Sequence, residues 1–138
     1  MKFRLTHSTE WISYESRVKM HQILNGVGNI DKYTDRASGT PYEGVALRLF
    51  NPKTTLWSIH WADSNTGSLD PPMVGSFENQ VGHFFARDTF NGKRIIEVFR
   101  WDVRNPEFPI WSQAFSADEG KTWEWNMINV SERVPPKR

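Results

Sequence analysis

VGHFFARDTFNGKRIIEVFRWDV, residues Val81–Val103, consists of two strand-like runs on either side of the dipeptide Asn91-Gly92. Asn-Gly is the preferred dipeptide of a two-residue type I′ turn, which joins two antiparallel strands. The turn sets the register, with Phe90 opposite Lys93, Ala86 opposite Glu97, Phe84 opposite Phe99, and Gly82 opposite Trp101. One face of this hairpin therefore carries large aromatic side chains together with two carboxylates, Asp88 and Glu97.

The same alternation of short strand-like runs and turn signals continues along the chain. Nine runs are typical of strands: Glu10–Leu24, Gly28–Tyr33, Tyr42–Phe50, Leu56–Ala62, Met73–Glu78, Val81–Phe90, Lys93–Val103, Phe108–Ser116 and Thr122–Val130. No segment has a convincing helical period. Because short turns join antiparallel neighbours, the sequence predicts an all-β, antiparallel up-and-down meander that closes into a barrel of about 8 to 10 strands.

A second hairpin is predicted by a motif near the end of the chain. Residues Ser116–Trp123 match the Asp-box pattern Ser-x-Asp-x-Gly-x-Thr-Trp. The Asp118 carboxylate can accept hydrogen bonds from its own turn, Gly120 supplies a φ that other residues resist, and Trp123 anchors the returning strand. One copy of the motif in 138 residues cannot supply the several blades of a propeller, so we interpret it as structural.

Length, charge and composition exclude several classes of protein. A chain of 138 residues fits a single domain, 1–138, with Val134–Arg138 as a disordered tail. The net charge of +1 arises from 17 basic and 16 acidic residues that are interleaved, which gives no field favouring nucleic acid. The absence of cysteine excludes disulfides and thiolate chemistry. With no apolar signal region and no membrane span, the sequence predicts a cytoplasmic location.

Several segments resemble a known family. Gly44–Trp61, and Trp111–Ser116 running into the Asp box, are similar to an uncharacterised bacterial family of calycin-like, lipocalin-type barrels, and the likeness extends over about Thr9–Arg133. The resemblance implies an antiparallel barrel around a cavity, but it assigns no functional residues because the family has no agreed activity. Relatives open with a further strand bearing a Trp, whereas this chain has Phe3-Arg4-Leu5. That edge of the barrel is therefore either open or covered by a second chain.

The aromatic content predicts a lining for the barrel. The chain has seven Trp and nine Phe, and aromatic side chains on one strand face make a rigid apolar wall. The predicted ligand-binding residues are Trp57, Ile59, Trp61, Glu97, Phe99, Trp101, Trp111, Gln113 and Trp125, with Gln113 as an orienting hydrogen-bonding group. The competing interpretation is a solid core in which the same rings fill the interior.

The hairpin at Asn51-Pro52 gives a second predicted register. A five-residue loop would place Leu49, Leu47 and Val45 opposite Trp57, Ile59 and Trp61, which matches apolar side chains across the pair. Arg48 would then point to solvent. A role for Arg48 in binding a ligand carboxylate is the alternative.

Evidence for catalysis or for a metal is weak in this sequence. Glu97, with Asp88 diagonally across its hairpin, is the candidate for a general acid, and a structural hydrogen bond or a ligand contact are the alternatives. The four histidines show no metal-ligand spacing, so we predict neither a metal nor a cofactor.

Three functions follow from these observations. The leading hypothesis is a protein that binds a small hydrophobic or aromatic molecule inside the barrel. The second is an enzyme that uses Glu97. The third is a structural barrel with a filled core that forms a homodimer through an exposed apolar face such as that of Ile96 and Val98.

Overall fold

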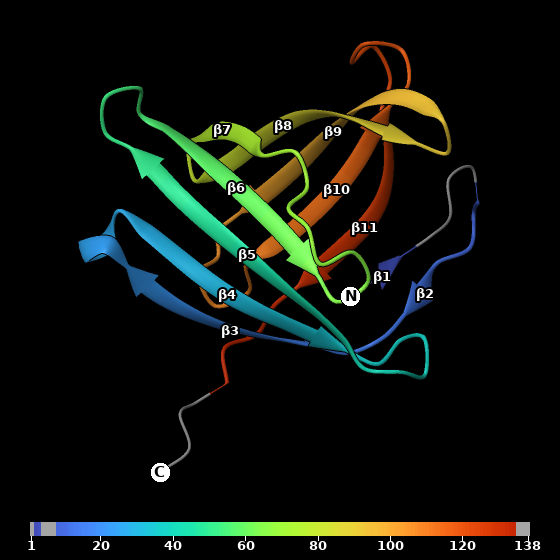
Figure 1. Ribbon diagram of the computed structural model, residues 1–138, viewed down its shortest axis with the longest axis horizontal. Coiled ribbons are helices and arrows are strands. Elements are labelled where there is room, and N and C mark those ends of the chain that lie inside the picture. The colour runs from blue at the N-terminus through green and yellow to red at the C-terminus, as the bar shows by residue number, and fades with distance from the viewer. Residues whose placement is uncertain (1, 4–7, 135–138) are drawn as a thin grey trace.

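The computed structural model describes residues 2–3 and 8–134, and its strands form one curled antiparallel sheet (Figure 1). The strands are β1 (Lys2–Phe3), β2 (Ile12–Ser13), β3 (Ser16–Ile23), β4 (Gly28–Asp35), β5 (Tyr42–Asn51), β6 (Leu56–Asp63), β7 (Met73–Glu78), β8 (Val81–Phe90), β9 (Lys93–Asp102), β10 (Ile110–Ser116) and β11 (Glu124–Val130). A 3₁₀ helix, η1 (Leu24–Gly26), follows β3. Within the described residues, no helix is long and apolar enough to cross a membrane.

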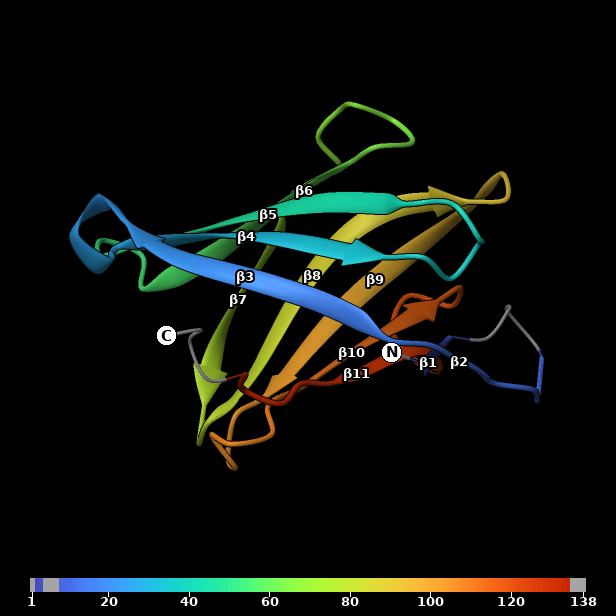
Figure 2. The same ribbon diagram turned by 90° about the horizontal axis from the view of Figure 1, so that it is seen from below.

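The strand order is that of a meander. Within the described residues it runs β2-β1-β11-β10-β9-β8-β7-β6-β5-β4-β3, so from β3 to β11 each strand pairs with the next along the chain. The sheet curls so that β3–β6 form one wall and β8–β11 cross it as a second wall (Figure 2). The predicted all-β class and antiparallel barrel-like meander are confirmed. Eight of the nine predicted strands, from Gly28 onward, agree with β4–β11 to within two residues.

The first predicted strand is the exception. Glu10–Leu24 divides into β2 and β3, with Tyr14 and Glu15 between them. β2 pairs with β1, and β1 pairs with β11, so β2 stands at one end of the strand order. Tyr14 and Glu15 connect it to β3, which stands at the other end. The sequence did not identify β1 as a strand. Val134 is exposed, and the rest of the predicted tail lies outside the described residues.

The hairpin of β8 and β9 has the predicted register. Phe90 pairs with Lys93, Ala86 with Glu97, Phe84 with Phe99, and Gly82 with Trp101. Asn91 and Gly92 both have positive φ, 50° and 77°, as a type I′ turn requires. The Asn-Gly dipeptide is therefore sufficient to specify which side chains share a face here.

The hairpin of β5 and β6 differs from its prediction by one residue. Asn51 pairs with Leu56, so the loop has four residues, 52–55, and Arg48 lies opposite Ile59. The side chain of Asn51 accepts hydrogen bonds from the backbone N–H groups of Lys53 (2.9 Å) and Thr54 (3.4 Å), which closes the shorter turn. The predicted pairing of Leu49, Leu47 and Val45 with Trp57, Ile59 and Trp61 is wrong. Since side chains alternate along a strand, Arg48 shares a face with Trp57, Ile59 and Trp61.

The Asp box forms the turn between β10 and β11 as its pattern predicts. Asp118 Oδ1 accepts hydrogen bonds from the backbone N–H of Thr122 (2.9 Å) and from Ser116 Oγ (2.8 Å). Hydrogen bonding, chiefly from the Thr122 side chain, lowers the pKa of Asp118 to about 2. Trp123 then packs against Phe85 of β8, with ring centroids 6.1 Å apart. The motif therefore anchors the turn on the outside of the second wall.

A small hydrophobic core lies where the sheet bends between its two walls. Ile59, Met73 and Phe84 are almost fully buried, and Trp57, Ala86, Phe99 and Trp101 pack against them. Only 1% of the surface of Phe84 is accessible to solvent. This cluster fixes the curvature that brings β5 and β6 over β9 and β10.

Candidate functional site

Pairing across the strands assigns each side chain to one of two faces of the curled sheet. We call the face that carries Arg48, Trp57 and Phe99 the concave face, and the opposite face the convex face. The guanidinium carbon of Arg48 on β5 lies 5.4 Å from the ring centroid of Trp101 on β9. Three strands separate β5 from β9 in the sheet, so this contact crosses the interior between the two walls.

Eight of the nine predicted lining residues lie on the concave face. They are Trp57, Ile59, Trp61, Glu97, Phe99, Trp101, Trp111 and Gln113, as the registers of β5 to β10 show. Trp111 packs edge-on against Phe99, with centroids 5.1 Å apart. Trp57, Ile59, Phe99 and Trp101 also belong to the core cluster or pack on it. One end of the predicted lining is therefore packed core, whereas Trp61, Glu97, Trp111 and Gln113 lie outside that cluster.

Trp125 is the exception, and its expected place on the concave face is wrong. The pairing of β10 with β11 shifts between Gln113 and Ala114, so Gln113 pairs with Met127 but Ala114 pairs with Trp125. This β-bulge reverses the alternation of side chains along β11. Asn126 accepts a 2.8 Å hydrogen bond from Gln113 Nε2, and the indole of Trp125 is turned to the convex face.

Arg48 is the most consequential residue that the sequence misplaced. Its side chain is only 14% exposed and forms a 2.6 Å ion pair with Asp31, whose side chain is 5% exposed. Arg48 Nη1 also donates a 2.9 Å hydrogen bond to Asn29 Oδ1. Asp31 and Asn29 lie on β4 directly opposite Ala46 and Arg48. The alternation Asn29-Ile30-Asp31 beside an arginine-bearing strand is the sequence signal that could have identified this pair.

A cluster of tyrosines and aspartates forms the other polar part of the concave face. Tyr33 donates a 2.7 Å hydrogen bond to Asp35, and Tyr42 donates a 2.9 Å hydrogen bond to Asp63. Trp61 Nε1 also donates to Asp63, at 3.3 Å. Burial raises the pKa of Tyr33 and of Tyr42, so both hydroxyls remain donors at neutral pH. The sequence analysis did not identify these tyrosines as candidate site residues.

Glu97 lies on the concave face with an unusual affinity for protons. Burial, together with the negative charges of Asp88 and Asp70, raises the pKa of its carboxyl to about 7. Asp70 belongs to the connection between β6 and β7, where its backbone N–H donates a 2.8 Å hydrogen bond to the carbonyl of Trp61. The negative charges of Asp88 and Asp70 thus act on the Glu97 carboxyl. Across residues 2–3 and 8–134, no group of His, Cys, Asp or Glu side chains is arranged to hold a metal ion.

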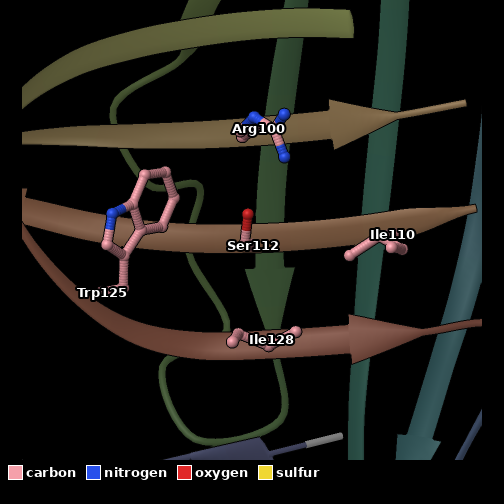
Figure 3. A pocket seen from close by; sticks show the side chains of 5 residues that line it. All are labelled: Arg100, Ile110, Ser112, Trp125 and Ile128. Atoms are coloured by element: carbon pink, nitrogen blue, oxygen red, sulfur yellow. The ribbon is translucent and has the colours of Figure 1, made fainter. Parts of the chain in front are cut away.

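Two hollows lie on the convex face. One of about 240 Å³ is lined by Arg100, Ile110, Ser112, Trp125 and Ile128 (Figure 3). The other, of about 470 Å³, lies under the Asp-box turn and is lined by Phe85, Ala86, Arg87, Ile96, Glu119, Gly120 and Trp123. Of the predicted lining residues, only Trp125 borders either hollow. Both are open depressions of the outer surface and are separate from the aromatic concave face.

Comparisons of the chain with family models, with curated proteins and with solved structures find no match. The resemblance to calycin-like barrels therefore stays a prediction. Function has to be argued from the geometry of the two faces.

Proposed function

We propose that the protein binds a small apolar or aromatic molecule against its concave face, in the manner of a calycin-like, lipocalin-type binding protein. The observation that carries the proposal is the concentration of aromatic and hydrogen-bonding side chains on one face of a sheet whose walls oppose each other. Aromatic walls with a few fixed polar groups are the usual chemistry of sites for small organic ligands. A cytoplasmic location and a bacterial origin belong to the same proposal.

The polar groups favour an uncharged ligand. Arg48 is already compensated by Asp31 at 2.6 Å, so its guanidinium offers hydrogen-bond donors rather than an unbalanced charge. The carboxyls of Glu97, Asp88 and Asp70 would repel an anion. Each buried side-chain nitrogen or oxygen of the described residues has a hydrogen-bond partner, so the concave face presents fixed donors and acceptors.

The proposal can be tested with N-phenyl-1-naphthylamine, an uncharged probe that fluoresces in apolar surroundings. We expect a saturable increase in fluorescence with the native protein and a weaker affinity for Trp111→Leu, which removes a half-buried part of the aromatic wall outside the core cluster. Trp125→Leu makes the same substitution on the convex face and is the matched control. Equal affinities for both variants, or no saturable signal, would contradict the proposal.

Glu97 supports a second candidate function. A carboxyl whose pKa is near 7 holds or releases a proton at neutral pH, which suits a general acid or base. If turnover of a bound ligand is found, Glu97→Gln should abolish it while the melting temperature is preserved. A variant that retains full activity would exclude this role.

A further inference from the structure

The hollow shown in Figure 3 has the composition of a binding site separate from the concave face. Ser112 pairs with Arg100 on one side and with Ile128 on the other, so these three side chains form one row across β9, β10 and β11. Ile110 and Trp125 complete the lining. In Figure 3 the strands of the first wall lie behind β9, β10 and β11. The five side chains therefore lie on the face of the second wall that is turned away from the first wall.

Arg100 brings positive charge to this hollow. Its nearest carboxylate is Asp102, whose Oδ2 is 3.7 Å from Arg100 Nη2. Asp102 is already engaged by Arg104, which donates from Nε to Oδ1 at 2.9 Å and from Nη2 to Oδ2 at 2.5 Å. Hydrogen bonds from the Arg104 side chain lower the pKa of Asp102 to about 2, so this carboxylate remains ionised. Two guanidinium groups therefore share one carboxylate, and one positive charge is left over.

The donors of Arg100 are available to a ligand. A guanidinium carries five N–H donors in a planar fork that matches a carboxylate. Among the described residues, Arg100 makes the long ion pair to Asp102 and no side-chain hydrogen bond within 3.5 Å. Its side chain is 31% exposed, so a ligand can reach it while solvent screening stays partial.

Ser112 supplies a second donor beside Arg100. The residue is only 7% exposed, and its hydroxyl points toward the β9 strand that carries Arg100 (Figure 3). Residues directly opposite in an antiparallel pair have Cα atoms about 4.5–5.5 Å apart. One carboxylate can therefore accept hydrogen bonds from the Arg100 guanidinium and the Ser112 hydroxyl together.

The other residues that line this hollow are apolar, and they determine which kind of organic group a ligand can place there. Ile110 and Ile128 flank the polar row, and the indole of Trp125 offers a flat surface at one end (Figure 3). The volume of about 240 Å³ falls below the roughly 300–1,000 Å³ of drug-sized sites, so the ligand is compact.

We propose that this convex-face hollow binds a small monocarboxylate with a compact aromatic or branched apolar body. The carboxylate is held by Arg100 and Ser112, and the apolar body lies against Trp125, Ile110 and Ile128. A single carboxylate matches the one uncompensated positive charge. This site is independent of the function proposed for the concave face.

The test is an NMR titration of the ¹⁵N-labelled protein with sodium benzoate at constant ionic strength. We expect a saturable shift of the Trp125 indole N–H signal, which Trp125→Phe identifies by removing it. Benzamide, the uncharged analogue, and inorganic phosphate, which lacks the apolar body, should each bind at least tenfold more weakly. Equal binding of benzamide would overturn the role of the charge, and equal binding of phosphate would overturn the role of the apolar walls.

Variants separate this site from binding elsewhere on the surface. Arg100→Gln should weaken benzoate binding at least tenfold, and Ser112→Ala should weaken it several-fold. Arg94→Gln is the matched control, because Arg94 is an exposed arginine on the same face of β9, six residues or about 20 Å away. The proposal is wrong if Arg100→Gln binds benzoate like the native protein, or if Arg94→Gln weakens binding as much as Arg100→Gln does.

Discussion

At the scale of single residues, the buried ion pair of Arg48 and Asp31 restricts substitution, because each charge needs the other as its partner. Two charges removed from water are tolerable only when they compensate each other and their remaining groups are hydrogen-bonded. Asn29 and the ring of Trp101 complete the surroundings of the guanidinium. Removing one member alone would leave the other as an uncompensated charge inside the protein.

Arg48→Met should therefore destabilise the protein by about 3–5 kcal/mol, because Asp31 is left buried without its partner. The double variant Arg48→Met/Asp31→Leu should recover most of that loss. Urea unfolding measures both. Arg87→Met is the control, since its ion pair with Glu119 is exposed and is worth less than about 1 kcal/mol. A double variant no more stable than the single one would show that the charge is not the cause.

Glu97 predicts a pH dependence of stability with a definite sign. Its pKa rises from 4.5 in the unfolded chain to about 7 in the folded protein, so the folded state binds the proton more tightly. The stability contributed by this group is complete below about pH 4.5 and is lost as the pH rises through 7. The loss amounts to about 3 kcal/mol at about 1.36 kcal/mol per pKa unit.

Glu97→Gln removes this titration and isolates its effect. The free energy of unfolding of the variant, relative to the native protein, should rise between pH 4.5 and pH 8, because only the native protein has to ionise a partly buried carboxyl. Urea unfolding at several pH values provides the measurement. A difference between the two proteins that does not change with pH would contradict the assignment.

At the scale of strands and turns, the residues within a turn determined the register of the paired strands more directly than the pairing of apolar side chains did. Asn91-Gly92 set the register of β8 with β9, and the Asp box set the turn before β11. At Asn51-Pro52 the choice of register rested on pairing apolar side chains, and it was wrong by one residue. The hydrogen bonds that Asn51 Oδ1 accepts from the backbone N–H groups of Lys53 and Thr54 close the shorter loop, and this turn chemistry outweighed the matching of apolar side chains.

Close approach of β7 to β8 gives a prediction at this scale. A β-carbon at Gly75 would lie 1.8 Å from the carbonyl oxygen of His83, and backbone cannot move aside as a flexible side chain would. Gly75→Ala should therefore destabilise the protein by about 3 kcal/mol or more. Ser76→Ala, at the exposed neighbouring position, should change stability by less than about 0.5 kcal/mol. Thermal or urea unfolding of both variants would reject this account if their stabilities were similar.

At the scale of the whole molecule, the alternation of side chains along the strands is sufficient to predict most of the aromatic face from the sequence. It failed for Trp125, because a β-bulge adds one residue to β11 and reverses the alternation beyond it. It also missed Tyr33 and Tyr42, whose hydrogen bonds to Asp35 and Asp63 depend on how neighbouring strands align. The hollow lined by Arg100, Ser112 and Trp125 could not be predicted either, since its row of side chains comes from three strands.

The central claim is that the concave face receives a guest molecule. The most direct measurement is a two-dimensional NMR titration that follows the indole N–H signals of the seven tryptophans with N-phenyl-1-naphthylamine. The account predicts saturable shifts at Trp61 and Trp111, with smaller ones at Trp57 and Trp101 and none at Trp123 or Trp125. Shifts confined to Trp123 and Trp125, or no saturable shift at any tryptophan, would contradict it.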